Sequence, residues 1–354
     1  MLRKLLSPFV IALLLLQPII VRADKVDDLI KAEMQRQRIP GLSLAIVKDG
    51  KIIKAEGYGL ANVEHNIPAK PETIYKIASV SKQLFASGIM ILAQDGKLSP
   101  EDKIGKFLEG TPESWNGVTL RHLMTHTSGI FREAPGFDPF KIQKDFDVIK
   151  TAYPLPLQFP TGEKYQYCNV GYFSLAEIIA RVSGKPWGEF LNERIFAPLG
   201  MAATQVTNSA AIIPNRADGY EWNKDKLQNS TDYLAVRPSG AFLSTVLDLA
   251  KWDAALYGDT ILKQATRELM WTPVKLNDGK TYPYGFGWEL SPLGNHRQIH
   301  HGGSLPGFRS RYSRFPDDKL SIIVLTNSDN ANPVTIVQAI AALYFSDLPV
   351  KAGN

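Results

Sequence analysis

The spacing of apolar residues predicts a helix followed by a β-hairpin early in the chain. Residues 25–38 place apolar side chains on one helical face, at Val26, Leu29, Ile30 and Met34. The β-rich runs 42–48 and 51–61 follow. They flank Asp49-Gly50, a pair that favours a tight hairpin turn because such turns need positive φ angles.

A second β region lies near the other end of the chain. The runs 308–315 and 320–327 are rich in β-forming residues and are separated by the turn 316–319. Residues 333–345 then have the apolar spacing of a helix. Because the two ends share this pattern, we expect an antiparallel sheet that is built from both ends and flanked by the terminal helices.

The middle of the chain is different, because helical patterns such as that of residues 174–184 alternate there with loops that contain Pro and Gly. We therefore predict an α/β (α+β) fold. Residues 24–79 and 236–354 would form an α/β lobe, and residues 80–235 a mainly helical lobe inserted between them. A cleft between the two lobes is the expected ligand site.

The first residues, 1–23, have the pattern of an export signal. Two basic residues precede an almost unbroken apolar stretch over residues 5–21, and Val21-Arg22-Ala23 fits a signal-peptidase site. An uncleaved membrane anchor is the alternative, but Pro8 and Pro18 interrupt the stretch. We expect cleavage after Ala23 and a periplasmic or secreted protein without stable membrane insertion.

Charge and cysteine content narrow the class of protein further. Loss of residues 1–23 removes three positive charges and lowers the net charge from +5 to +2, which gives no reason to expect a nucleic-acid or membrane-surface partner. Cys168 is the only cysteine, so the chain folds without an internal disulfide. It also lies far from the signal region, which excludes a lipid-modified N-terminal cysteine. The oligomeric state is not indicated.

Candidate chemistry begins at Ser79, which heads the only Ser-x-x-Lys in the chain. A serine nucleophile needs a neighbouring base, and Lys82 falls one helical turn later, on the same face of a helix. The hydroxyl would also lie near the positive end of the helix dipole. In the simpler alternative, Ser79 caps a helix and Lys82 points to water.

The second candidate is Tyr167-Cys168-Asn169, the only Tyr-x-Asn in the chain. A phenol held against an ammonium is driven toward phenolate and acts as a general base, while an amide orients both the lysine and a substrate carbonyl. A buried tyrosine beside a turn asparagine is the structural alternative.

The third candidate is His301-Gly302-Gly303, which leads into the strand expected from Phe308. Glycines let a backbone approach a ligand closely and leave N–H groups free for an oxyanion, although a plain glycine turn is the alternative. His296 and His300 have a spacing seen in metal sites, but no adjacent Glu and no clear third ligand accompany them, so we expect no metal.

In this order, the three elements resemble the serine β-lactamase and penicillin-binding protein superfamily. The Tyr-x-Asn element is similar to the branch that contains class C β-lactamases, D-alanyl-D-alanine carboxypeptidases and esterases. Residues 120–130, 238–252 and 284–290 also resemble recurrent segments of that branch, so the resemblance covers most of the chain.

The resemblance implies a role for each candidate residue. Ser79 would be the nucleophile, Lys82 and Tyr167 the proton-transfer pair, and Asn169 an orienting, substrate-binding side chain. The backbone N–H groups of Ser79 and Ser304 would form the oxyanion hole, with Gly303 beside them in the substrate-binding segment. No cofactor is implied, and His126 falls in a segment that we take to be a structural loop.

Two departures from the family pattern bear on the substrate. His301 stands where many members have the lysine of Lys-Thr-Gly, and Gly302 replaces a hydroxyl residue that helps to hold a substrate carboxylate. Imidazole is mostly neutral near pH 7 if its pKa stays near about 6.5. Arg309 or Arg311 would have to supply a replacement charge.

We therefore expect an exported, metal-independent serine hydrolase that acts through an acyl-serine on ester, amide or D-amino-acid peptide bonds of a small-molecule or peptide substrate. The alternatives are an efficient β-lactamase, or a noncatalytic penicillin-binding-like protein that keeps the cleft.

Overall fold

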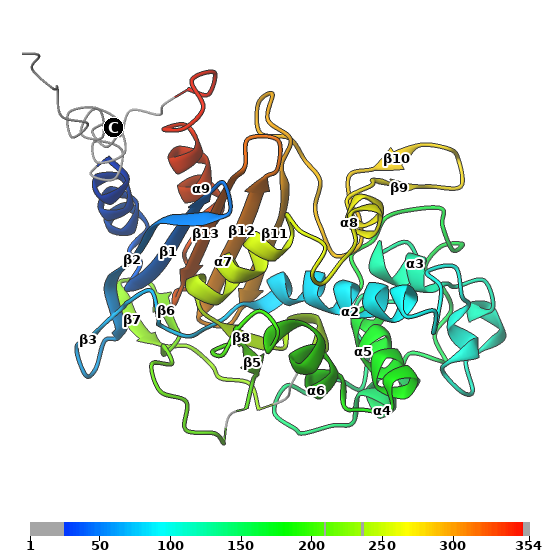
Figure 1. The fold of residues 1–354 in the computed structure, drawn as a ribbon. Helices are drawn as coiled ribbons and strands as arrows, with labels where there is room; N and C mark the ends of the chain where they lie inside the picture. Colours follow the sequence, from blue (N-terminus) through cyan, green and yellow to red (C-terminus); the bar gives the residue numbers. More distant parts are fainter. Residues whose placement is uncertain (1–24, 209, 235–236, 350–354) are drawn as a thin grey trace, which may run out of the picture.

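A six-stranded antiparallel sheet is the largest sheet among the residues that the structure describes (Figure 1). The computed structural model describes residues 25–208, 210–234 and 237–349, so the predicted signal peptide, residues 1–23, lies outside them. The strand order is β11–β12–β13–β1–β2–β3, with the bounds β1 Gly41–Lys48, β2 Lys51–Asn62, β3 Ile67–Pro68, β11 Ile299–Leu305, β12 Phe308–Phe315 and β13 Leu320–Thr326. The sheet joins strands from both ends of the chain, which confirms the predicted fold.

The central strand β1 pairs with β2 on one side and with β13 on the other. Asp49 and Gly50 join β1 to β2 with φ angles of 51° and 72°, so the predicted hairpin turn is confirmed. Every residue of β13 is buried. A strand that is buried along its whole length is expected where both faces of a sheet are covered.

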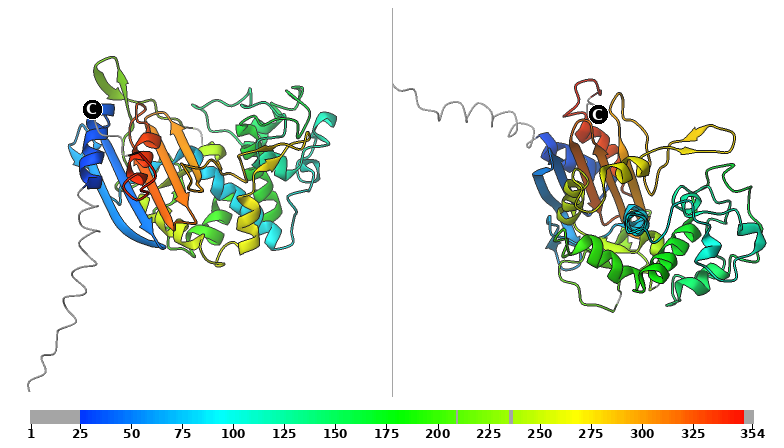
Figure 2. Two further views of the ribbon diagram at one scale, coloured as in Figure 1. Left: turned by 90° about the horizontal axis from the view of Figure 1, so that it is seen from above. Right: turned by 45° about the vertical axis from the view of Figure 1, so that its right-hand side comes forward.

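Alternate residues of β1 face two different apolar cores. Leu44 and Ile46 pack with the helix over residues 25–37 and with α9 (Pro333–Ala341). Ala45 and Val47 belong to the core on the other face, which includes α7 (Val246–Ala255). Figure 2 shows the two terminal helices together on one face of the sheet. Each fully buried aliphatic side chain contributes about 1.5–3 kcal/mol to folding.

The predicted terminal helix, residues 333–345, is shorter than its apolar pattern. α9 ends at Ala341, and a turn follows. Phe345 keeps its place in the pattern because it is buried outside the helix, stacked on the His296 ring at 3.6 Å between ring centroids. Burial, rather than helix continuation, explains that last apolar position.

Helices and loops dominate the chain between the two halves of the sheet. α2 (Lys82–Gln94) and α5 (Asn169–Ser183) pack against each other in this region (Figure 1). The remaining helices are η1 Ala78–Ser81, η2 Ile104–Lys106, η3 Glu113–Trp115, α3 Leu120–Met124, α4 Asp145–Lys150, α6 Trp187–Leu191, η4 Asn192–Phe196, η5 Pro238–Gly240 and α8 Gln264–Met270. Among the residues described, no helix has both the length and the apolarity to cross a membrane.

Short strands complete the structure outside the main sheet. They form one three-stranded and two two-stranded sheets, from β4 Tyr75–Lys76, β5 Gln205–Val206, β6 Tyr220–Asn223, β7 Lys226–Asn229, β8 Phe242–Ser244, β9 Val274–Lys275 and β10 Thr281–Tyr282. The lobe boundaries that the sequence suggests, between residues 79 and 80 and between 235 and 236, stay a prediction.

The third sequence element differs from expectation, because it lies within a strand rather than before one. β11 begins at Ile299 and carries His301, Gly302, Gly303 and Ser304 as the edge strand of the sheet. Glycine has low β-propensity, but cross-strand pairing with β12 overrides it. The paired residues run from Ile299 opposite Arg314 to Leu305 opposite Phe308. The glycine-rich segment therefore presents one open backbone edge.

Candidate active site

A pocket of about 610 Å³ brings together all but one of the site residues predicted from the sequence. Its wall comes from η1, the start of α5, η5 and the edge strand β11. The predicted residues in the wall are Ser79, Tyr167, Asn169, His301, Gly303 and Ser304. The exception is Lys82, which lies fully buried behind the wall.

The backbone at Ser79 is held in an uncommon conformation. Ala78 has a φ angle of 49°, which costs a non-glycine residue energy and occurs often at functional sites. Ser79 follows as the second residue of the 3₁₀-helix η1, where backbone N–H groups have no acceptor within the helix. The strained turn thus leads to a serine that is partly exposed in the pocket.

The structure separates the two hydroxyls of the Ser79-Val80-Ser81-Lys82 segment. Ser81 is completely buried, and its Oγ accepts a hydrogen bond from the Phe242 backbone N–H at 3.2 Å. Ser79 alone lines the pocket. Only Ser79 therefore has access to a substrate.

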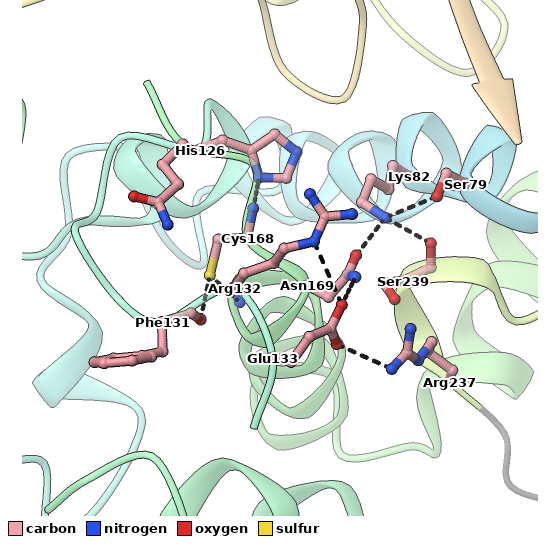
Figure 3. Close-up of polar contacts among 12 residues, drawn as sticks. Ser79, Lys82, His126, Phe131, Arg132, Glu133, Cys168, Asn169, Arg237 and Ser239 are labelled. Atoms are coloured by element: carbon pink, nitrogen blue, oxygen red, sulfur yellow. Dashed lines mark hydrogen bonds and ion pairs between the residues drawn. The ribbon is translucent and has the colours of Figure 1, made fainter. Parts of the chain in front are cut away.

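Three oxygen atoms surround the buried amine of Lys82. Its Nζ donates to Ser79 Oγ at 3.2 Å, to Asn169 Oδ1 at 3.0 Å and to the Ser239 carbonyl at 2.7 Å (Figure 3). Burial lowers the pKa of Lys82 well below its ordinary value, and the Arg237 guanidinium lowers it further. A lysine in this state readily becomes a neutral amine, which can take the proton of the Ser79 hydroxyl.

The side chain of Asn169 is fixed at both of its ends. Its oxygen accepts from Lys82, while its Nδ2 donates to Glu133 Oε1 at 2.6 Å (Figure 3). Glu133 in turn pairs with Arg237 at 2.9 Å and lies 3.6 Å from Arg132. The carboxylate therefore determines which way the Asn169 amide faces.

Tyr167 lies against Lys82, with the lysine Nζ 4.7 Å from the centre of the tyrosine ring. Burial raises the pKa of Tyr167, and its interaction with the Ser79 hydroxyl opposes that shift only in part. The phenol consequently stays protonated in the free protein, which differs from the phenolate that the sequence argument considered. The two pKa directions favour Lys82 as the base and Tyr167 as a proton donor and relay.

The loop over residues 126–133 holds the Tyr167-Cys168-Asn169 segment in place. His126 O accepts from the Gln166 N–H at 2.8 Å, and His126 Nδ1 accepts from the Cys168 N–H at 3.0 Å. The Asn169 N–H donates to the Arg132 carbonyl at 2.8 Å. This loop contains residues 126–129 of the Thr-His-Thr-Ser-Gly segment, and these contacts give it the structural place expected from the sequence.

Cys168 has a structural place within this segment. It is the N-cap of α5, where its Sγ accepts from the Gly171 N–H at 3.4 Å. Complete burial raises the pKa of the thiol to about 12, which disfavours the reactive thiolate.

The glycine at position 303 allows β11 to approach the nucleophile. A Cβ atom there would lie 2.3 Å from the Ile77 carbonyl oxygen and 3.0 Å from Ala78 Cβ. At Gly302 the nearest atom to a Cβ would be 3.6 Å away, which is ordinary contact. The close approach at Gly303 brings Ser304 to the same pocket as Ser79, while the oxyanion hole expected from their backbone N–H groups stays a prediction.

His301 faces the interior with both ring nitrogens. Its Nδ1 is 2.6 Å from the Gly302 carbonyl oxygen and its Nε2 is 3.0 Å from Tyr284 Oη. Burial lowers the pKa of His301 to about 4, although Glu289 opposes the shift. The imidazole is therefore neutral at pH 7 and presents no positive charge to the pocket.

The two arginines considered as replacements for that charge already have partners. Arg309 pairs with Asp329 at 2.7 Å, and the Arg311 guanidinium lies 3.8 Å from Glu289. Although burial opposes ionisation, His300, His301 and Arg311 lower the pKa of Glu289 to about 2, so the carboxylate is charged. Neither Arg309 nor Arg311 presents an uncompensated charge.

The two histidines whose spacing raised the possibility of a metal site bind other groups. His296 contacts Asp318 through Nδ1 at 2.8 Å and Asp347 through Nε2 at 2.9 Å. His300 Nε2 is 2.6 Å from Ser291 Oγ.

Sequence reasoning missed four groups near the site. Ser239 and Tyr284 lie in segments that resemble recurrent segments of the family, so this resemblance could have indicated them. Glu133 and Arg237 lie outside those segments, and no sequence pattern indicated them. Glu133 contacts Asn169, which is 36 positions away in the chain, and Arg237, which is 104 positions away. Such pairings follow from the fold and leave no local pattern.

Comparison with known proteins finds similarity along nearly the whole described chain. The family model "Beta-lactamase" matches residues 26–345. The octameric penicillin-binding protein homologue from Pyrococcus abyssi superposes with a TM-score of 0.82 at 30% sequence identity, covering 93% of this chain and 78% of that one.

Two curated proteins show the same relationship by sequence. Penicillin-binding protein 4* of Bacillus subtilis (strain 168) is 33% identical over 319 residues, which cover 83% of this chain and 69% of that protein. D-aminopeptidase of Gluconobacter oxydans (strain 621H) is 27% identical over 318 residues, which cover 86% of this chain and 58% of that protein. The chain thus spans about three fifths to two thirds of these relatives.

Proposed function

The chain belongs to the β-lactamase family of serine hydrolases, and from this we propose that it hydrolyses ester, amide or D-amino-acid peptide bonds through an acyl-enzyme on Ser79. The observation that carries the proposal is the contact of 3.2 Å between the buried Lys82 Nζ and the pocket-facing Ser79 Oγ. Burial of the amine supplies a base, and the strained turn supplies an accessible hydroxyl.

Acylation begins when the Ser79 oxygen attacks the carbonyl carbon of the substrate and its proton passes to the neutral Lys82 amine. The backbone N–H groups of Ser79 and Ser304 donate to the oxyanion that forms. Collapse of the intermediate breaks the bond to the leaving group. That group takes a proton from the Tyr167 phenol, and Lys82 returns a proton to Tyr167.

Deacylation repeats the sequence with water as the nucleophile. As water attacks the acyl carbon, its proton passes to Lys82 through the Tyr167 and Lys82 pair. The bond to Ser79 then breaks, Ser79 takes a proton back from Lys82, and the acid is released. Asn169 keeps the Lys82 amine oriented in both halves, because it accepts from Nζ at 3.0 Å.

The third element supports esters and amides over β-lactams as substrates. A β-lactam carboxylate is held best by a fixed positive charge and a hydroxyl, whereas this pocket offers an inward-facing neutral His301 and Gly302. One charge-assisted hydrogen bond is worth about 1.5–3 kcal/mol, or roughly 10- to 150-fold in relative rate constants. We therefore propose that short acyl esters are cleaved more efficiently than penicillins or cephalosporins.

We also propose that the protein is exported. The support is the basic start, the apolar stretch over residues 5–21 and the Val21-Arg22-Ala23 ending. Intact-mass analysis of the protein from the periplasm or medium would give a chain that begins at Asp24, and a full-length chain in the membrane fraction would refute the proposal.

Multiple-turnover assays test the substrate class and separate it from the alternatives. A nitrophenyl ester, a D-alanyl-D-alanine peptide and a chromogenic cephalosporin are each incubated with the mature protein. We expect many equivalents of ester product per protein and a lower kcat/KM for the cephalosporin. At most one equivalent with every substrate would indicate a noncatalytic binding protein, and a preference for the cephalosporin would indicate a β-lactamase.

A further inference from the structure

Three buried polar side chains form a row that runs from the pocket wall at His301 into the interior, and none of them takes part in the proposed proton transfers. Tyr284 Oη is 3.2 Å from His126 Nε2 and 3.0 Å from His301 Nε2. The three residues are at most 2% exposed. They come from the loop after α3, the segment before β11 and β11 itself, so the row joins three separate parts of the chain.

The direction of each hydrogen bond follows from the groups at the two ends of the row. The Cys168 N–H donates to His126 Nδ1 at 3.0 Å, so this nitrogen carries no proton and the neutral ring donates from Nε2 to Tyr284. At the other end, His301 Nδ1 faces the Gly302 carbonyl at 2.6 Å and must carry the proton. Nε2 of His301 then accepts the Tyr284 O–H proton.

The row therefore has a single consistent assignment with both imidazoles neutral. A proton on His126 Nδ1 would oppose the Cys168 N–H, and a proton on His301 Nε2 would leave two imidazole donors facing the Tyr284 oxygen. In agreement, burial lowers the pKa of His126 well below its ordinary value and that of His301 to about 4. The ionisable groups that face the row are Lys82, Arg132, Tyr165, Tyr167, Tyr172, Glu289 and His300.

Backbone geometry gives an independent sign that the surroundings hold His126 firmly. Its φ angle is 61°, in the left-handed region that is uncommon for residues other than glycine. Strained residues of this kind persist where surrounding contacts determine the conformation. Here the backbone carbonyl and both ring nitrogens of His126 are all bonded.

We propose that His126, Tyr284 and His301 form a positioning relay that sets the distance between the proton-transfer residue Tyr167 and the oxyanion strand β11. One end of the relay holds the Cys168 backbone, next to Tyr167, and the other holds the Gly302 carbonyl, next to Gly303 and Ser304. The His126 ring also packs on the Tyr167 ring, at 4.2 Å between centroids. The inference rests on the proposed hydrolysis, and none of the three residues is assigned a chemical step.

Substitution of Tyr284 by Phe tests the relay, because it removes the central hydroxyl and keeps the ring. We expect kcat for a nitrophenyl ester to fall by about tenfold to a hundredfold, with a much smaller change in KM, since the binding groups remain while their alignment is lost. Tyr220→Phe is the matched control. It removes the hydroxyl of another buried tyrosine, which accepts from the Val63 N–H at 2.8 Å and donates to the Glu64 carboxylate outside the pocket, and should leave kcat unchanged.

The tautomers give a readout that loss of stability alone would not change. Long-range ¹H–¹⁵N spectra of the wild type near pH 7 should show His126 protonated at Nε2 and His301 at Nδ1, both neutral. In Tyr284→Phe the His126 and His301 signals should shift. The opposite tautomer or a charged ring in the wild type would overturn the relay even if Tyr284→Phe failed to fold. A folded Tyr284→Phe variant whose kcat equals that of the wild type would also overturn the relay.

Failure of the relay and failure of the proposed function are distinguishable. If the wild type turned over none of the substrates, the hydrolase proposal would fail while the tautomer assignment could still be measured. If the wild type were active and Tyr284→Phe equally so, only the relay would fail.

Discussion

The carboxylate of Glu133 accepts a hydrogen bond from the Asn169 side-chain amide at 2.6 Å. Because the other end of that amide accepts from Lys82, Glu133 fixes the orientation of a group that contacts the catalytic amine. Glu133→Ala should lower kcat/KM for an ester by roughly 10- to 150-fold, the range for loss of one charge-assisted hydrogen bond. Glu133→Gln keeps an acceptor oxygen and is the matched control. Equal losses in the two variants would show that the orientation of Asn169 is not the reason.

The pH dependence of the reaction should follow the protonation of Lys82. Burial and Arg237 lower the pKa of Lys82, whereas Glu133 raises it. Activity should fall as the pH drops through that pKa, because the amine gains a proton and no longer accepts one from Ser79.

Two charge substitutions should move this acidic limb in opposite directions. Glu133→Gln removes the group that raises the pKa, so the limb should move to lower pH, and Arg237→Gln should move it to higher pH. Each shift should be below about one pH unit, because both side chains are partly exposed and screened. Profiles of kcat/KM for a nitrophenyl ester measure the shifts, and movement in the same direction would assign the limb to another group.

Adjacent glycines on β11 should respond very differently to the same substitution. A methyl group at Gly303 would lie 2.3 Å from the Ile77 carbonyl, so Gly303→Ala should push β11 away from Ser79 and reduce kcat/KM by about a hundredfold or more. Gly302→Ala has room for its methyl group and should stay within about threefold of the wild type. Circular dichroism checks that both variants fold, and an active Gly303→Ala would show that the close approach is unnecessary.

His296 should stabilise the C-terminal segment in a pH-dependent way. Burial opposes protonation, but Asp347 and Asp318 raise the pKa of His296 above its ordinary value. The histidine therefore adds stability that is fully present below the unfolded pKa of about 6.5 and is lost as the pH rises through the folded pKa. Comparison of Tm should show a larger deficit for His296→Asn at pH 5.5 than at pH 8.5.

The exposed His65 supplies the control for that measurement. His65→Asn should change Tm little at either pH. A deficit for His296→Asn that is the same at both pH values would mean that the ring contributes through its stacking on Phe345 and not through its charge.

Much of the fold was predictable because local patterns and burial agree. The Asp49-Gly50 turn, the β-forming run over 320–327 and the amphipathic terminal helices each have a direct physical cause in the sequence. The strand at 299–305 was not predictable in this way, because Gly302 and Gly303 have low β-propensity and the strand depends on pairing with β12.

The site shows the same division between local and distant causes. Ser79 and Lys82 lie one helical turn apart, so the spacing alone places the two side chains together. The hydrogen bond between Glu133 and Asn169 and the inward orientation of His301 arise from contacts between segments that are distant in the sequence. The protonated state of Tyr167 likewise depends on burial, which a local motif does not encode.

Covalent labelling tests most directly whether Ser79 is the nucleophile. The mature protein is treated with a fluorophosphonate or a slowly hydrolysed β-lactam, and the modified peptide is located by mass spectrometry. We predict one adduct, on Ser79, that is abolished in Ser79→Ala and retained in Ser81→Ala, provided that the latter folds. An adduct on Ser81 or Ser304, or unchanged labelling of Ser79→Ala, would contradict the assignment of Ser79 as the nucleophile.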